Sequence, residues 1–277
     1  MSPHPVSPGG TTIPPGPVPA ARRSGLSSAA AATAVLLAGV PAPWLREHPA
    51  ALAVVLLTIA GAGAVALCAR SAPAQRTVLA AATVLALVLV FGVVIWPAPL
   101  LLGPVAVWLA IRYRPALRPG VDWLRRGKLG RGLSWQIAAT IAVSATALIL
   151  WALITDPVPG PYLTSMQSRP VVVAMAGVLA FSLLNAACEE AAYRGVFQSE
   201  LTALMGAGPA VVVQAAGFGL AHATGFPSGP AGILLATVYG LMLGVIRHRS
   251  AGLLAPYLAH VCADLTIGAL ALTVLAS

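Results

Sequence analysis

Charged side chains are scarce in this sequence. Asp, Glu, Lys and Arg make up only 8% of its 277 residues, whereas 58% are hydrophobic. The surface of a soluble domain faces water, and about a quarter of its residues are usually charged. A chain with so few charges and a mean hydropathy of +0.89 needs lipid around it. The composition excludes an ordinary water-soluble protein and predicts an integral membrane protein.

The alternation of apolar and polar residues that marks membrane β-strands is missing as well. The apolar stretches are continuous runs of Ala, Leu and Val, which favour helices over the strands of a barrel. Because lipid allows only helices or closed barrels to span it, we expect an all-α fold, a polytopic bundle of transmembrane helices. The apolar segments are residues 26–45, 50–69, 77–96, 98–111, 135–154, 171–192, 209–224, 230–246 and 252–275.

These segments predict eight or nine spans, since one span needs about 20 residues. Segments 98–111 and 209–224 are short, so each is expected to be a tilted partial span or a buried helix. The last segment could be divided near Pro256.

Cysteine is also rare, and the three that occur lie within apolar runs. No CxxC or His–Cys spacing joins them, so the sequence predicts neither a disulfide framework nor a zinc knuckle. The three residues are Cys68, Cys188 and Cys262.

The net charge of +9 is concentrated in short connections between the apolar runs. This is the positive-inside pattern of membrane proteins, so we assign the charge to topology and expect no nucleic-acid partner. The pattern predicts a cytoplasmic N-terminus, with residues 1–25 as a disordered Pro-, Gly- and Ser-rich tail. The expected outer side keeps only Arg46 and Arg169. The expected inner side has Arg22, Arg23, Arg70, Arg76, the basic loop 112–131, Arg247 and Arg249.

That basic loop divides the chain into an N-terminal membrane part, residues 26–131, and a C-terminal part, residues 132–277. The Ala- and Arg-rich composition indicates a bacterial source, which predicts the bacterial plasma membrane as the location. Glu200 is expected near the end of a helix.

Ionisable side chains interrupt the apolar segments of the C-terminal part. A charged group in mid-membrane costs about 3 kcal/mol or more, so such groups are usually functional and share a polar cavity. Besides Arg194, which lies at the end of an apolar segment, these residues are Glu189, Glu190, His222, His260 and Asp264.

The first of these motifs is EExxxR. Glu190 and Arg194 are four residues apart on a helix, where they can form an ion pair. Glu189 points about 100° away from Glu190, which leaves it free to act as a base. Alternatively, both glutamates cap the inner end of the helix 171–192.

Two further motifs place pairs of residues on one helix face. Phe218 and His222 form FxxxH, and His260 and Asp264 form HxxxD, each with i, i+4 spacing. A lone histidine on an apolar helix is more often a hydrogen-bonded core residue. Together with a glutamate, however, the two pairs supply Glu, two His and Asp for one site.

The ordered set EExxxR, FxxxH and HxxxN/D, each on its own membrane helix, resembles the CPBP family of intramembrane proteases. This family includes CAAX prenyl proteases and bacterial relatives, some linked to bacteriocin maturation or self-immunity. The resemblance covers roughly residues 170–270. It implies a glutamic endopeptidase, without metal or cofactor, that hydrolyses a peptide bond of a membrane-associated protein or peptide.

By this resemblance Glu189 would activate water with His222, while His260 and Asp264 would stabilise the oxyanion. Glu190, Arg194 and Phe218 would support the site. The prenyl proteases have Asn where this chain has Asp264. Because an ionised carboxylate repels an oxyanion, Asp264 must be protonated or must hold His260, so His260 is expected to be the main donor.

Other functions fit parts of the pattern. Glu189, His222, His260 and Asp264 could ligate zinc in a metallopeptidase, although HExxH is missing. A transporter would use the same groups as a proton relay but predicts an inverted repeat, which the sequence does not show. A non-catalytic scaffold or immunity protein is a further alternative.

The expected position of Glu189 near the inner end of its helix predicts cleavage near the cytoplasmic face. The sequence gives no indication of the oligomeric state.

Overall fold

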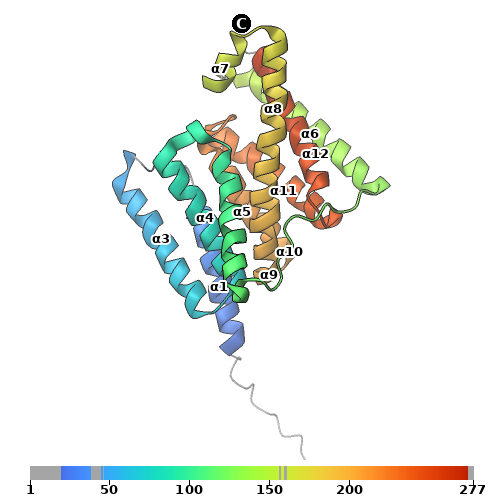
Figure 1. Ribbon diagram of the computed structural model, residues 1–277. Coiled ribbons are helices and arrows are strands. Elements are labelled where there is room, and N and C mark those ends of the chain that lie inside the picture. Colours follow the sequence, from blue (N-terminus) through green and yellow to red (C-terminus); the bar gives the residue numbers. More distant parts are fainter. Residues whose placement is uncertain (1–19, 39–44, 46, 156, 159–160, 274–277) are drawn as a thin grey trace, which may run out of the picture.

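The computed structural model describes residues 20–38, 45, 47–155, 157–158 and 161–273, which form a bundle of helices without strands (Figure 1). This confirms the all-α prediction. The N-terminal part contains α1 (Ala20–Ala38), α3 (Pro49–Cys68), α4 (Ala72–Phe91) and α5 (Ala98–Tyr113). The C-terminal part contains α6 (Arg131–Thr155), α7 (Pro161–Gln167), α8 (Val171–Glu189), a π-helical segment (Glu190–Phe197), α9 (Gln198–Met205), α10 (Ala207–Ala221), α11 (Gly229–Ser250) and α12 (Leu254–Leu272).

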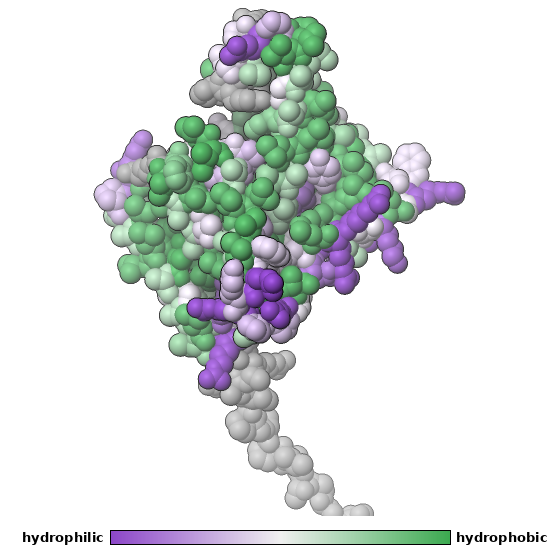
Figure 2. All heavy atoms as spheres, in the orientation of Figure 1, coloured by the Kyte–Doolittle hydropathy of each residue, from purple (hydrophilic) through white to green (hydrophobic). Residues whose placement is uncertain are grey.

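Six helices of the described residues are long and apolar enough to cross a membrane. Two shorter apolar helices, Gly25–Ala38 and Ala98–Tyr113, accompany these six, so the number of helices is roughly consistent with the predicted eight or nine spans. Apolar side chains cover much of the visible face of the bundle, and hydrophilic ones gather at its lower rim and around the start of α6 (Figure 2). The protein is therefore a helical membrane bundle.

Each of the nine predicted apolar segments overlaps a helix of the described residues, but several boundaries differ, and residues 39–44, 274 and 275 lie outside the described residues. α1 begins at Ala20, six residues before the predicted start, and residues 1–19 of the predicted tail lie outside the described residues. Pro256 does not divide the last segment, because it is the third residue of α12, where its missing N–H has no partner to lose within the helix.

The largest correction concerns the helix that carries EExxxR. α8, the π-helical segment and α9 form one continuous helix of 35 residues, Val171–Met205. Glu189 and Arg194 consequently lie in the middle of this helix, and neither is near its end. The capping alternative and the reason for expecting cleavage near the cytoplasmic face are both wrong.

Small residues and glutamines fix the packing of α9 and α10 against α11. Gln214 Nε2 donates to the carbonyl of Gly240 at 2.9 Å, and Gln198 Nε2 donates to that of Gly244 at 2.9 Å. Small residues allow membrane helices to approach closely, and polar side chains then bind across the contact. These bonds hold the three helices in register.

The loop 114–130 crosses one end of the bundle, from the lower end of α5 to the start of α6 (Figure 1). It binds the turn between α11 and α12 through Lys128 N to Ser250 O at 2.9 Å and Leu253 N to Arg125 O at 2.8 Å. Gly127, with φ +81°, faces Gly252 so closely that a Cβ at either position would collide with the other's backbone. This loop thereby fixes the beginning of α12.

We expect Gly219→Ala to destabilise the protein by about 1–3 kcal/mol, the usual cost of overpacking. A Cβ at Gly219 would lie 2.7 Å from the backbone oxygen of Ile233 and would collide with Thr237 on α11. Thermal unfolding in detergent micelles measures the effect. The matched control is Gly208→Ala on the same helix, since a Cβ there meets nothing within 4 Å. Equal unfolding temperatures for the two variants would contradict this packing.

Candidate active site

The EExxxR residues lie where the long helix changes its winding. Glu190 begins the π-helical segment and Arg194 lies within it, and both side chains are buried. Arg194 Nη1 is 2.9 Å from Glu190 Oε1, so the expected ion pair is present. π-Helical turns are rare and often occur at functional sites. The sequence predicts an ordinary α-helix here and gives no signal for the change.

His260 reaches the same carboxylate from α12. Its Nδ1 lies 2.7 Å from Glu190 Oε1, so one oxygen of Glu190 contacts both His260 and Arg194. With the Nδ1 hydrogen directed to Glu190, the other ring nitrogen faces the neighbouring acids. His260 Nε2 is 3.4 Å from Glu189 Oε2 and 3.8 Å from Asp264 Oδ1. Three of the predicted residues therefore surround His260.

The two adjacent glutamates differ in their contacts. Glu189 is also buried, with 4% of its surface exposed, but its Oε2 makes no hydrogen bond. The nearby Nε2 of His260 is within ion-pair distance only. Glu190 Oε2 likewise makes no hydrogen bond, so the two residues differ in the arginine: Glu190 contacts Arg194 and His260, whereas Glu189 is within ion-pair distance of His260 alone among the described residues.

The FxxxH motif enters the site through the ring of Phe218. This buried ring lies 4.6 Å from the ring of His222 and 5.9 Å from that of His260, between centroids. The guanidinium of Arg194 stands over its face at 4.4 Å, a cation–π arrangement. Phe218 thus packs against both histidines and the arginine.

His222 follows the end of α10 in a short 3₁₀ turn, His222–Thr224. Its Nδ1 is 2.8 Å from the backbone oxygen of Phe218, so Nδ1–H donates there and Nε2 keeps its lone pair. His260 and Asp264 are near enough to interact with it electrostatically. Within the described part of the chain, no hydrogen bond or ion pair links His222 to Glu189.

Sequence reasoning missed two polar residues that support Asp264. Asn185 Nδ2 donates to Asp264 Oδ2 at 3.1 Å, and Trp96 Nε1 donates to Asn185 Oδ1 at 3.0 Å. Asn185 was detectable as a polar residue in an apolar run, four positions before Glu189. Trp96 belongs to the N-terminal part, and nothing in its local sequence indicates this partner.

Arg76 does not lie in a connection as predicted but in α4, where it is completely buried. Its Nε and Nη2 donate to the two oxygens of Glu200 at 2.7 and 2.6 Å. Its Nη1 donates to the carbonyls of Leu117 at 2.5 Å and Pro119 at 3.1 Å. Trp123 Nε1 donates to Glu200 Oε1 at 2.6 Å. Neither the ion pair nor its burial was expected from the sequence.

This ion pair connects three distant segments. Arg76 comes from the N-terminal part, Trp123 from the loop 114–130, and Glu200 from α9, ten residues after Glu190. The backbone oxygen of Trp123 also lies near Gly195 of the π-helical segment. The candidate site is therefore anchored by residues outside the helices that contain its motifs.

No group of three or more His, Cys, Asp and Glu side chains among the described residues is arranged to hold a metal ion. The three cysteines are free thiols, and Cys188 is buried beside Glu189.

Residues 170–266 match the family model described as Type II CAAX prenyl endopeptidase Rce1-like. This segment is therefore similar to an Rce1-like domain. The match contains all three motifs and confirms the suspected relation to the CPBP family, a family of proteases, over about a third of the chain. Comparisons with curated proteins and with solved structures gave no match. Arg76, Trp96 and Trp123 lie outside the matched segment.

We expect Arg76→Met to destabilise the protein by about 3–5 kcal/mol, because it leaves the buried Glu200 carboxylate without its cation. The double variant Arg76→Met/Glu200→Met should recover most of this loss, since no isolated charge then remains. Thermal unfolding in detergent micelles checks both. Arg114→Met, at an exposed position, is the control. If the double variant is no more stable than Arg76→Met, the ion pair does not explain the loss.

Proposed function

We propose that the protein is an intramembrane endopeptidase in which Glu189 activates water to hydrolyse a peptide bond of a membrane-associated protein or peptide. The observation that carries this proposal is the difference between the two glutamates. Glu190 forms an ion pair with Arg194 and also contacts His260, whereas the ion-pair contact of buried Glu189 among the described residues is His260 Nε2 alone, at 3.4 Å. The Rce1-like domain is consistent with this chemistry.

In the proposed mechanism, Glu189 takes a proton from water while the oxygen attacks the peptide carbonyl carbon. His222, whose Nε2 lone pair is available, assists this step. The proton then passes to the leaving amine as the C–N bond breaks, giving a carboxylic acid and a free amine, and transfer of the acid proton to the amine leaves a carboxylate and an ammonium group. A positioned general base typically contributes 10²–10⁴-fold in rate.

In its doubly protonated, cationic form, His260 is the proposed oxyanion donor, since Nδ1–H binds Glu190 and Nε2 needs a second proton to donate. Its Nδ1 is fixed by Glu190, and its Nε2 faces the space between Glu189 and Asp264. A donor that is already fixed in place needs little reorganisation during the reaction, and removal of one such donor commonly lowers kcat by 10²–10³-fold. Arg194 supports this arrangement through Glu190, and Phe218 supports it by packing against both histidines.

Asp264 has a positioning role in this proposal. Its Oδ2 accepts from Asn185, and its Oδ1 lies 3.8 Å from His260 Nε2, beyond hydrogen-bond distance. An amide oxygen could accept the same bond from Asn185. The negative charge of Asp264 is therefore not required to keep the side chain in place.

The first test compares peptide termini formed in host membranes with wild type, Glu189→Gln and His222→Ala. We expect mass spectrometry to find termini that only wild type produces, with Glu189→Gln at least 100-fold weaker. Glu47→Gln is the matched control, since Glu47 is exposed and outside the site.

Adding a zinc chelator to the same membranes distinguishes the metal-free peptidase from a zinc metallopeptidase. Unchanged termini after chelation agree with the proposal, whereas their loss and recovery with zinc favour a metallopeptidase. Identical termini from wild type and Glu189→Gln, at equal expression, favour a non-catalytic scaffold or immunity protein.

A second prediction concerns Asp264. We expect Asp264→Asn to retain activity within about tenfold, because the amide keeps the bond from Asn185, while His260→Ala loses about 100-fold or more. Initial rates on a substrate found in the first test provide the measurement. A rate for Asp264→Asn as low as that for His260→Ala would mean that the carboxylate charge is essential.

A further inference from the structure

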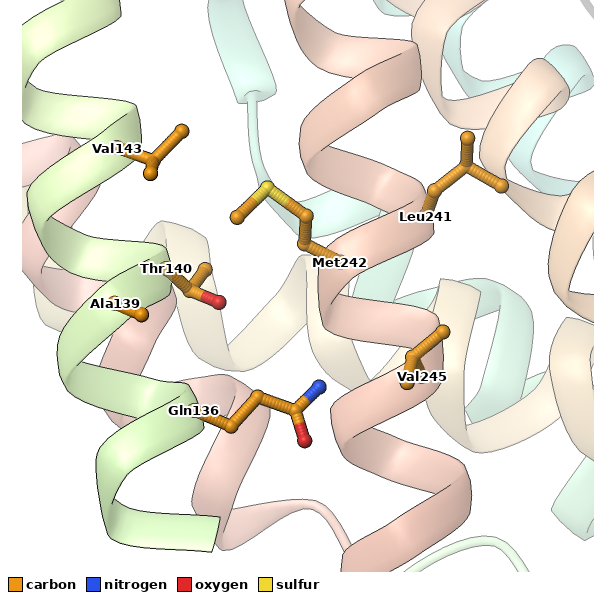
Figure 3. A pocket seen from close by; sticks show the side chains of 7 residues that line it. All are labelled: Gln136, Ala139, Thr140, Val143, Leu241, Met242 and Val245. Atoms are coloured by element: carbon orange, nitrogen blue, oxygen red, sulfur yellow. The ribbon is translucent and has the colours of Figure 1, made fainter. Parts of the chain in front are cut away.

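A groove lies between α6 and α11, and none of the residues that line it belongs to the candidate active site. Its volume is about 340 Å³, and the side chains that line it are apolar except for Gln136 and Thr140 (Figure 3). Ala139 and Val143 line it on α6, and Met242 and Val245 line it on α11. Because both helices are candidate membrane spans, we expect the groove to face the acyl region of the bilayer.

The groove has one polar end. The lining residues of α6 follow i, i+3, i+4 and i+7 from Gln136 to Val143, a single helix face about 10 Å long. Arg249 lies four residues beyond Val245 on α11, and its Nη1 donates to Gln136 Oε1 at 2.9 Å. The guanidinium therefore stands at one end of the groove, and the apolar lining extends away from it.

Two other exposed basic residues lie near the same end along the backbone. Lys128 is exposed, and its backbone binds Ser250, the neighbour of Arg249. Arg131 is the exposed first residue of α6. Among the described residues, no carboxylate forms an ion pair with Lys128, Arg131 or Arg249. Asp122, the acid closest to Lys128 in sequence, pairs with Arg125 instead. This cluster therefore lacks a counter-charge from the described protein.

Trp135 marks the same level of the bilayer. Its side chain is 74% exposed, one residue before Gln136, and exposed tryptophans of membrane proteins concentrate at the headgroup level. The basic cluster is thus placed at the depth of lipid phosphates, with the apolar groove below it in the acyl region.

We propose that this groove binds one anionic phospholipid, with its phosphate at Arg249, Lys128 and Arg131 and one acyl chain between α6 and α11. The basic residues match the negative phosphate of such a lipid, and the apolar lining of the groove matches its acyl chain. Basic pockets between membrane helices are known to bind anionic headgroups. A zwitterionic lipid would bring its own cation to the cluster, so the site distinguishes lipids by headgroup charge.

Native mass spectrometry of the full chain tests this site. The protein is released from nanodiscs containing equal amounts of phosphatidylglycerol and phosphatidylcholine with identical acyl chains. We expect wild type to retain one phosphatidylglycerol in preference to phosphatidylcholine. Arg249→Gln and Lys128→Gln should each lower that preference about fivefold, as expected for one basic residue near a membrane surface. Arg114→Gln removes an equal charge outside the groove and should leave the preference unchanged.

A second variant tests the groove separately from the charge. Ala139→Phe fills the groove at an exposed position without altering any charge, and we expect it to lower retention as much as Arg249→Gln does. Thermal unfolding of each variant confirms that it is folded. Unchanged retention in Ala139→Phe would show binding by surface charge alone and overturn the site. An unchanged preference in Arg249→Gln and Lys128→Gln would overturn it as well.

Discussion

The ion pair between Arg76 and Glu200 is the contact on which the arrangement of the two parts of the chain depends. A buried charge that loses its partner costs several kcal/mol, so Glu200 requires the N-terminal part. Arg76 in turn uses Nη1, which carries two hydrogens, to donate to the loop carbonyls of Leu117 and Pro119. The N-terminal helices and the loop 114–130 are thus structurally part of the unit that contains the Rce1-like domain.

The same loop connects both halves of the candidate site. Trp123 contacts Glu200 and the π-helical segment, and residues 125–128 bind the turn that precedes α12. Glu190 belongs to the π-helical segment and His260 to α12, and their side chains approach to 2.7 Å. The loop and this contact therefore connect the same two helices at two separate places.

Local sequence pattern explains the parts that were predicted correctly. The helices follow from continuous apolar runs, and the Glu190–Arg194 pair follows from i, i+4 spacing within one helix. Arg76, by contrast, is indistinguishable in sequence from a loop arginine, since its partner is 124 residues away. Trp96 and Trp123 were missed for the same reason. The approach of His260 to Glu190 rather than to Glu189 alone depends on how two helices pack, which their separate patterns do not specify.

The change from α- to π-winding at Glu190–Phe197 has a consequence for the whole helix. A π-helical turn contains about one residue more than an α-helical turn, and each residue of an α-helix advances by about 100°. Without the additional residue, every side chain after Phe197 would point in another direction relative to Asn185 and Glu189. Gln198 would no longer face Gly244, and Glu200 would no longer face Arg76. The π-helical segment therefore fixes the rotation of α9 relative to α8. One helix can then make the site contacts of α8 and the contacts of Gln198 and Glu200 at the same time.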